Sequence, residues 1–180
     1  MNKIIAIVGM CGSGKSVASE LLVNRGYKRV YFGGVTMDKL KEKGLEVTPE
    51  NEKMMREKLR EDLGMGAFAK LLLPKIKELS LDNLVVLDGL YSWDEYKILN
   101  DEFKKQLVTL AIVCDKKIRY NRLKTREERP LTVSQARERD LAEIENIAKA
   151  PPIAYADYYI FNNGTLEDYE KQLEEILKQI

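Results

Sequence analysis

The feature that most limits the possible folds is a glycine-rich loop between an apolar run and a helical pattern. The run IIAIV at 4–8 has the length of a buried strand, and GMCGSGKS follows it directly at 9–16. Apolar residues at helical spacing begin after Lys15. Glycines in a G-x-x-x-x-G-K-[ST] pattern permit turns that aim successive backbone N–H groups at one anion. The order strand, loop, helix therefore predicts an anion site at a helix N-terminus.

This Gly-rich loop (residues 9–16) predicts the binding of a nucleoside triphosphate with magnesium. Lys15 would reach the β and γ phosphates, and the hydroxyl of Ser16 would ligate Mg²⁺. The residues expected to contact the nucleotide, taken as ATP, are Gly9, Met10, Cys11, Gly12, Ser13, Gly14, Lys15, Ser16 and Val17. The alternatives are a chance Gly-rich turn that ends in Lys-Ser, and a redox role for Cys11 near a helix N-terminus.

The composition excludes several mechanisms. The chain of 180 residues contains no histidine, which excludes a Ser-His-Asp or Cys-His nucleophilic site and a His-ligated zinc site. Its 30 basic and 29 acidic residues give a net charge of +1, so no global field attracts nucleic acid or an anionic membrane. The widely spaced Cys11 and Cys114 fit a reducing cytoplasm, and no apolar stretch approaches the roughly 18 residues of a membrane span. We therefore expect a cytoplasmic protein that binds neither nucleic acid nor membrane.

Five apolar runs of strand length alternate with helical patterns, at 4–8, 29–32, 84–88, 107–114 and 158–161. Most of the runs are continuous, which is typical of strands buried on both faces of a parallel sheet. This predicts an α/β protein made of a single domain over 1–180. Thr132 with Gln135 forms a capping-box pattern, and Thr165 is a plausible cap of the last helix. Residues 35–80 carry no strand pattern and are expected to form a helical insertion that binds a phosphoryl acceptor.

The accompanying residues separate the classes of protein that use such a loop. An Asn-Lys-x-Asp guanine reader is missing, which argues against a GTP-binding switch, and 180 residues are too few for a transport ATPase. A small-molecule kinase needs a helical acceptor pocket, an acid at a strand end beside the loop, and an arginine-rich lid. Asp88 ends the run LVVLD, so it could help to hold Mg²⁺ or accept the proton of an acceptor hydroxyl. The alternative role of Asp88 is to cap the following turn.

The lid is expected at residues 115–135. Its first part, 115–129, holds seven basic and three acidic residues, and seven minus three leaves a local charge of +4. Its arginines recur at spacings of three and four and could converge on phosphates from one helix face. We expect Arg119 to bind the nucleotide and Arg129 to bind the acceptor. Arg122 and Arg126 are expected to contact the transferring phosphoryl group. A solvated helix face is the alternative.

Other arginines are candidates for binding the acceptor. Arg56 and Arg60 are four residues apart on a predicted helix of the insertion and could hold an acidic part of the acceptor. Pairing with neighbouring acids on the surface is the alternative for both. Arg139, on the helix after the lid, could return to the same site.

Together these motifs resemble the nucleoside monophosphate kinases and dephospho-CoA kinase, and in particular a small family of adenylate-kinase-related P-loop proteins. The matching segments cover nearly the whole chain: GMCGSGKS at 9–16, KGLEVTPEN at 43–51, KLRE at 58–61, VVLDG at 85–89, RYNRLKTR at 119–126, RD at 139–140 and ADYYIFNNGTLEDY at 156–169. The resemblance implies a three-layer P-loop kinase fold with strand order 2-3-1-4-5. The last segment is similar to the end of dephospho-CoA kinases, which implies that Asn162 and Gly164 lie near the adenine ring.

Two positions depart from the pattern of adenylate kinases. The Gly-Asp-x-x-Arg after the second strand is replaced by Gly-Gly-Val-Thr-Met at 33–37, and the Asp-Gly-x-x-Arg after the third strand by Asp-Gly-Leu-Tyr-Ser at 88–92. Met37 and Ser92 thus occupy the positions of the two arginines that would bind an acceptor monophosphate. Each such charge-assisted contact is worth about 1.5–3 kcal/mol, so an acceptor must be held differently, or be bulkier and less anionic at that point.

We interpret the sequence as that of an ATP- and Mg²⁺-dependent small-molecule kinase, monomeric or homodimeric, that transfers the γ-phosphoryl group to a nucleotide-like acceptor. One alternative is a dephospho-CoA kinase-like activity, which the C-terminal segment favours. The other is an ATP-binding regulator with slow ATPase turnover, which the missing arginines favour. The identity of the acceptor and the preference for ATP over GTP stay open.

Overall fold

The apolar runs form a parallel sheet in the computed structural model, which describes residues 2–127 and 129–180. Residue 1, and residue 128 of the expected lid, lie outside the described residues. The strands are β1 (Ile4–Val8), β2 (Lys28–Tyr31), β3 (Val85–Asp88), β4 (Leu107–Val113) and β5 (Tyr158–Phe161). All neighbouring strands are parallel, in the order β2-β3-β1-β4-β5. The predicted fold class and strand order are confirmed.

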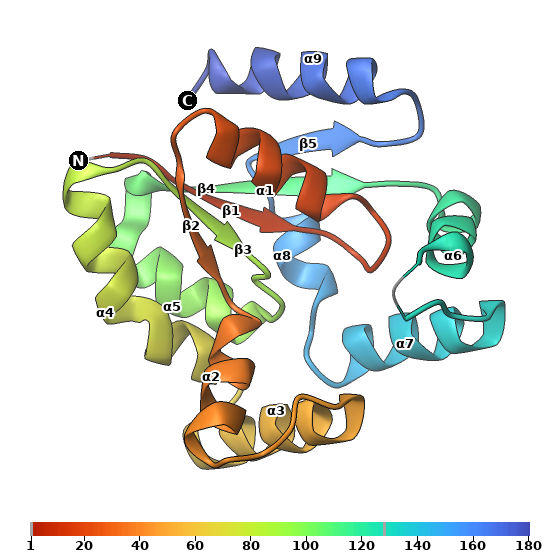
Figure 1. The fold of residues 1–180 in the computed structure, drawn as a ribbon. Coiled ribbons are helices and arrows are strands. Elements are labelled where there is room, and N and C mark those ends of the chain that lie inside the picture. Colours follow the sequence, from red (N-terminus) through yellow and green to blue (C-terminus); the bar gives the residue numbers. More distant parts are fainter. Residues whose placement is uncertain (1, 128) are drawn as a thin grey trace.

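Helices cover both faces of this sheet and give the protein three layers (Figure 1). One face carries α1 (Lys15–Asn24) and α9 (Leu166–Leu177). The opposite face carries α4 (Ala67–Asp82), α5 (Trp93–Phe103) and α8 (Ala150–Ala154), and the short 3₁₀ helix η1 (Lys104–Gln106) leads into β4. Because β1 lies at the centre, its five residues are all buried, which explains the continuous apolar run.

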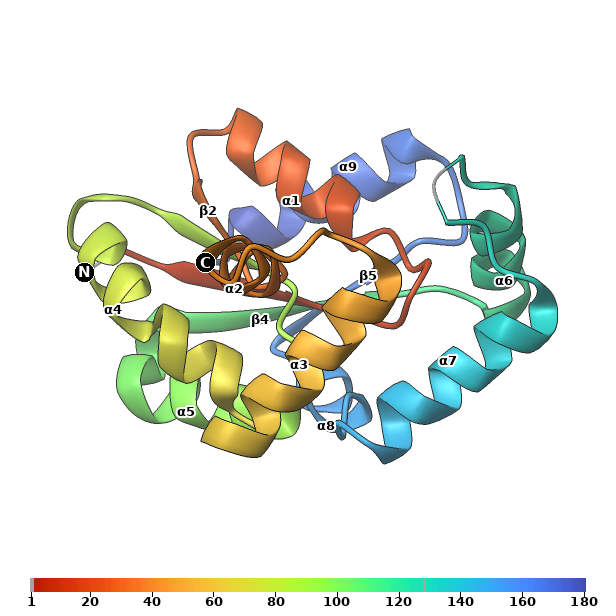
Figure 2. The same cartoon turned by 60° about the horizontal axis from the view of Figure 1, so that its bottom comes forward.

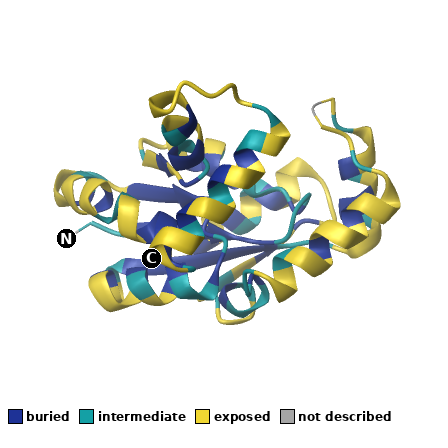
Figure 3. Cartoon of the chain, turned by 90° about the horizontal axis from the view of Figure 1, so that it is seen from below, coloured by how far each residue is buried: buried dark blue, intermediate teal, exposed yellow. Residues whose placement is uncertain are grey.

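The sheet separates two apolar clusters, one beneath each helical layer. Ile5 packs with Leu22 of α1 and Leu173 of α9, whereas Ile4 belongs to the cluster that contains Leu99 of α5. Neighbouring residues of one strand thus serve opposite faces, as the pleat of a strand requires. Figure 3 shows the buried strands between helices whose outer surfaces are exposed.

The remaining helices lie beyond the C-terminal ends of the strands. Between β2 and β3 the chain forms α2 (Gly34–Glu42), α3 (Pro49–Leu63) and then α4; between β4 and β5 it forms α6 (Lys116–Thr125) and α7 (Val133–Glu145) before α8. Figure 2 shows α3 and α7 on the same side of the molecule. In a parallel sheet this edge is where ligands bind. The helices α2 and α3 of the expected insertion and α6 of the expected lid lie there, whereas α4 packs on a face of the sheet.

Side-chain caps set where several helices begin. The predicted capping box of Thr132 and Gln135 opens α7, and Thr165 caps α9 through the backbone N–H of Asp168. A box that was not predicted, Ser92 with Glu95, opens α5. Among residues 2–127 and 129–180, we find no helix with the length and apolar character that a membrane crossing requires.

Leu87 provides a test of the core. Its side chain is fully buried in β3, so Leu87→Ala should lower the free energy of unfolding by about 2–5 kcal/mol through lost burial and a cavity. Leu81→Ala is the matched control, because Leu81 is 66% exposed on α4 and its truncation should change stability by less than about 0.5 kcal/mol. Urea unfolding followed by circular dichroism measures both. Equal losses would contradict the assigned positions of the two leucines.

Candidate functional site

The Gly-rich loop has a backbone that its glycines permit. Gly12 and Gly14 have φ angles of 78° and 101°, in the left-handed region that favours glycine. A side chain at Gly9 would bring its Cβ to 2.5 Å from the carbonyl oxygen of Ile112, so the loop could not lie this close to β4 with any larger residue. The hydroxyl of Tyr169 on α9 donates to the carbonyl of Gly14 at 3.1 Å. The loop is therefore fixed from both sides.

The start of α1 is open to an anion. Its N-cap residue is Gly14, which has no side chain to occupy the first N–H groups, and the first turn carries no acid. Ser13 is buried, and its Oγ has no hydrogen-bond partner in the part of the chain that the structure describes. Ser16, by contrast, is exposed. Free helix N–H groups, an unpartnered hydroxyl and an exposed hydroxyl together fit a phosphate group with a bound cation.

Lys15 turns back onto the loop. Its Nζ donates to the carbonyl oxygen of Met10 at 3.0 Å. Burial, and then the charge of the neighbouring Lys149, lower the pKa of Lys15 to about 7; the charges of Cys11 and Glu143 act in the opposite direction. Because the charged form of Lys15 is unfavourable here, an anion bound next to its ammonium group would stabilise it.

Asp88 stands at the edge of the sheet beside the loop, as predicted. It pairs in register with Ile7 of β1 and Tyr31 of β2, and only 7% of it is exposed. Its carboxylate forms an ion pair with Arg29 of β2, which the sequence analysis did not single out. The only sequence signal for Arg29 is a charged residue within a short strand.

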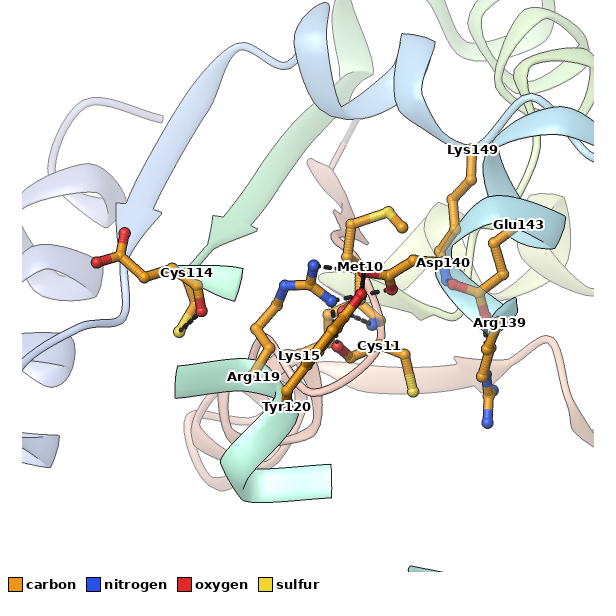
Figure 4. A network of polar contacts seen from close by, with 11 residues as sticks. Met10, Cys11, Lys15, Cys114, Arg119, Tyr120, Arg139, Asp140, Glu143 and Lys149 are labelled. Atoms are coloured by element: carbon orange, nitrogen blue, oxygen red, sulfur yellow. Dashed lines mark hydrogen bonds and ion pairs between the residues drawn. The ribbon is translucent and has the colours of Figure 1, made fainter. Parts of the chain in front are cut away.

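Arg119 braces the Gly-rich loop from α6. Its guanidinium donates to both oxygens of Asp140 on α7, at 3.0 and 2.7 Å, and to the carbonyl of Cys11 at 2.9 Å. Tyr120 also donates to Asp140, at 3.1 Å, and Figure 4 shows the network. Both charged side chains are buried. Arg119 therefore lies against the backbone of the predicted nucleotide site, with its donors directed to protein acceptors.

Arg122 belongs to the other side of the site. It donates to the carbonyl and side-chain oxygens of Asn162 at 3.1 and 3.3 Å and to the sulfur of Cys114, and Asn162 in turn donates to the carbonyl of Ser13 at 2.7 Å. Gly164 lies in the same turn after β5. The structure thus joins Arg122, which we expected at the phosphoryl group, to Asn162, which we expected near the base.

Two predicted acceptor residues meet on one carboxylate. Arg129 donates to Glu52 of α3 at 2.8 and 3.2 Å, and Arg56 donates to the same carboxylate at 3.3 Å. The hydrogen bond from Arg129 is the main cause of the lowered pKa of Glu52. Arg126 donates to the carbonyl of Arg129. The ion pair on Glu52 connects the insertion to the lid segment.

Arg60 points to the junction of α3, α4 and α5. Its guanidinium lies 5.2 Å from the ring centre of Phe68, and its Nε is buried with no partner among the described residues. Glu95 is fully buried and accepts hydrogen bonds from the backbone N–H groups of Tyr91 and Ser92. Burial raises the pKa of Glu95 to about 7, although these bonds and the charge of Arg60 oppose the shift.

A further cluster lies at the C-terminal end of α7. Arg139 donates to Glu143 at 3.1 Å, and Lys149 donates to the other oxygen of this carboxylate at 2.7 Å. The Nζ of Lys149 also lies 4.9 Å from the ring centre of Tyr91. Arg139 was predicted, but Lys149 and Glu143 were not. The sequence signal for Lys149 is a single lysine within the apolar run NIAKAPPIA.

Comparisons with known proteins identify the family of the chain. A family model described as an AAA domain matches residues 5–146. A UPF0200 protein from Sulfurisphaera tokodaii is 37% identical over 184 residues, covering 99% of this chain and 97% of the relative. The chain belongs to the UPF0200 family. The match to the domain model, together with the strand order of the sheet, confirms the predicted placement in the P-loop superfamily.

Solved structures show the same fold at low identity. A shikimate kinase from Bacteroides thetaiotaomicron aligns with a TM-score of 0.63 and 13% identity, over 98% of this chain and 97% of that one. A sugar kinase from Janibacter sp. HTCC2649 aligns with a TM-score of 0.59 and 13% identity, over 99% and 94%. This UPF0200 protein therefore has the fold of the P-loop kinases.

Breaking the buried pair of Arg119 and Asp140 should be costly. Asp140→Ala leaves a buried guanidinium without its carboxylate and should lower the free energy of unfolding by about 3–5 kcal/mol. The control is Glu174→Ala, which breaks the more exposed pair with Arg25 and should cost at most about 1 kcal/mol. Urea titrations at neutral pH compare the two variants. A loss at Asp140 no larger than at Glu174 would show that the buried pair does not hold the loop.

Glu95 predicts a dependence of stability on pH. Its pKa rises from 4.5 to about 7 on folding, so the folded state binds more protons between these values and stability falls as pH rises through this range. Glu95→Gln removes the titration. Relative to wild type, the variant should therefore gain on the order of 3 kcal/mol between pH 4.5 and 8. Urea midpoints across this pH range measure the difference in stability between each variant and wild type. For the control Glu174→Gln this difference should stay constant with pH. A constant difference for Glu95→Gln as well would refute the raised pKa of Glu95.

Proposed function

We propose that this protein is an ATP-dependent small-molecule kinase that transfers the γ-phosphoryl group to a nucleotide-like acceptor. The observation that carries the proposal is the open N-terminus of α1 and the Gly-rich loop, with Lys15 at one side and the strand-end Asp88 at another. The kinase-like fold and the match to an AAA domain model support nucleotide binding.

The loop would hold the phosphates of ATP through its backbone N–H groups and the positive end of α1. Lys15 would leave the carbonyl of Met10 for the β and γ phosphates, whose charge relieves the cost of its burial. Mg²⁺ would supply charge neutralisation at the phosphates; the hydroxyl of Ser16 would hold it directly, and Asp88 would hold it through water, which leaves the carboxylate able to accept a proton. Asn162 and Arg122 would border the base, since Asn162 contacts the loop at Ser13.

The chemical step would use few protein groups. The oxygen of an acceptor hydroxyl forms a bond to the γ-phosphorus as the bond to the bridging oxygen breaks, and ADP leaves with that electron pair. The proton of the hydroxyl passes to Asp88, whose carboxylate is oriented by Arg29. Lys15 and Arg139 would supply positive charge that stabilises the transferring oxygens. The chain has no histidine, so Asp88 is the base that this position offers.

The regulator with slow ATPase turnover is the second candidate, and a specific observation favours it. Arg56 and Arg129, which were expected to hold the acceptor, are both engaged with Glu52. A kinase would have to release these arginines from Glu52 when the acceptor binds, or bind the acceptor through other cationic side chains. A dephospho-CoA kinase-like activity differs only in the acceptor and enters the same assay.

The test measures ADP formation with ATP, Mg²⁺ and a panel of nucleoside monophosphates, deoxynucleotides, nucleosides and dephospho-CoA. At least one acceptor should raise the rate about tenfold or more above the acceptor-free rate. Lys15→Ala should lower that rate about 100-fold, because it removes a cation from the transferring group. Lys171→Ala, at an exposed position of α9, should behave as wild type.

Binding by calorimetry separates the alternatives. If the wild-type protein binds ATP but no acceptor in the panel raises the rate of ATP consumption, the result supports the regulator and contradicts the kinase. If Lys15→Ala binds ATP as tightly as wild type, the assignment of the Gly-rich loop as the phosphate site is wrong.

A further inference from the structure

An open groove lies at the edge of the sheet opposite the Gly-rich loop. Its volume is about 750 Å³, which is within the usual range of ligand sites. It is lined by Leu107 and Tyr158, the first residues of β4 and β5, and by Lys3, which directly precedes β1. The Gly-rich loop follows the other end of β1, and the five residues of this strand, at about 3.3 Å each, span about 16 Å. The groove is therefore separate from the proposed phosphate site.

Three aromatic rings meet beside the groove, where α5 packs against α8 on one face of the sheet (Figure 1). The rings of Trp93 and Tyr96 stack with their centres 4.9 Å apart, and the ring of Tyr155 stands at 81° and 76° to them. Tyr96 and Tyr155 line the groove. These contacts hold the ring of Tyr155, yet the residue is 68% exposed. An aromatic side chain that is both held and accessible offers a surface on which a planar ring can stack.

The charged side chains of the groove leave a positive surplus. Lys3, Lys104 and Lys105 line it together with one acid, Asp157, and three minus one leaves +2. Within the described part of the chain, none of these lysines forms an ion pair. The Nζ of Lys3 donates to the carbonyl of Lys105 at 3.2 Å, which leaves its charge uncompensated. The carboxylate of Asp157 is engaged by the backbone N–H of Thr109, at 2.7 Å.

The turn that carries two of the lysines has an unfavourable backbone. Lys104 ends α5 with a φ of 46° and a ψ of −121°, a conformation that suits glycine. Residues with side chains keep such conformations where the surrounding structure imposes them, and these positions cluster at ligand sites. A glycine would form the same turn without the strain, but also without the charge. The side chain of Lys104, and not the turn itself, is therefore what this position requires.

These features together fit a nucleotide with one phosphate group. A phosphate monoester carries about −1.5 to −2 at neutral pH, which matches the surplus of the lysines. A base can stack on Tyr155, because every base has a flat aromatic face. The side-chain amide of Asn100, which also lines the groove, can form hydrogen bonds with the polar edge of a base. An anion without a ring, or a ring without a charge, would use only part of these groups.

We propose that this groove is a second ligand site, which binds a nucleoside monophosphate with its base on Tyr155 and its phosphate at Lys104 and Lys105. The inference goes beyond the proposed kinase function and does not depend on it. A nucleotide held at this edge is remote from Lys15 and Asp88, so it is not a reactant in phosphoryl transfer.

The test follows the backbone amide signals of isotopically labelled protein by nuclear magnetic resonance while AMP is added. The signals of Asn100, Lys105 and Asp157, which all line the groove, should shift together with a single affinity. Adenosine and inorganic phosphate each carry one half of the ligand. Each should bind at the groove at least about tenfold more weakly than AMP, because each leaves either the lysines or the ring of Tyr155 without a partner.

Two variants of Tyr155 and a matched control test the stacking. Tyr155→Ala should weaken AMP binding at the groove about tenfold or more, whereas Tyr155→Phe, which keeps the ring, should stay within about twofold of wild type. Phe161→Ala is the control, because Phe161 is a 65% exposed aromatic residue of β5 that is not among the lining residues. Its affinity for AMP should match that of wild type.

Lys104→Gly separates binding from structure and keeps the proposal testable should Tyr155→Ala not fold. The urea midpoint of this variant should be unchanged or higher, since relief of backbone strain offsets the greater freedom of glycine in the unfolded chain. Its affinity for AMP should fall about fivefold or more, because one cation is lost. A purely structural role of Lys104 predicts no loss of affinity.

Each outcome supports or overturns the proposal. It is overturned if AMP shifts no signal of the groove, if adenosine or phosphate binds there as tightly as AMP, or if Tyr155→Ala or Lys104→Gly keeps the affinity of wild type. A separate titration with AMP-PNP and Mg²⁺, a non-hydrolysable ATP analogue with its cation, is read from the signals of Gly12 and Gly14. The proposed function and the groove can therefore fail independently of each other.

Discussion

The site depends on the outward direction of the carbonyl groups in the Gly-rich loop. Three of them accept hydrogen bonds from side chains outside the loop: Cys11 from Arg119, Ser13 from Asn162 and Gly14 from Tyr169. A peptide group whose carbonyl is held on one side directs its N–H to the other. The bonds thus orient the N–H groups inward and hold the loop in one conformation, which lowers the cost of ordering the loop on binding.

The sequence predicted the frame of the fold because its signals are local. Continuous apolar runs indicated buried parallel strands, and the cap patterns at Thr132 and Thr165 marked two helix starts. The direction of charged side chains could not be predicted in this way. Arg119 and Arg122 are three residues apart on α6, yet one binds Asp140 and the other Asn162. Such choices depend on which distant segments come close, and no local spacing encodes them.

The carboxylate of Glu52 connects two segments of the chain. It forms ion pairs with an arginine of the lid segment and an arginine of α3, so it joins the two segments. A negatively charged acceptor would compete with Glu52 for these guanidinium groups, whereas a neutral one would not. For the proposed kinase, the ion pairs of Glu52 would therefore favour an anionic acceptor, which can take over contacts with the guanidinium groups.

The contacts of Asn162 and Tyr169 also bear on how the protein is made. They join the Gly-rich loop to residues 149 and 155 positions later in the chain. During synthesis, the N-terminal strand and loop leave the ribosome long before these partners exist. The loop can therefore take its final shape only after β5 and α9 have emerged and docked, so a nascent chain stopped before Asn162 carries the whole motif but an incomplete phosphate site.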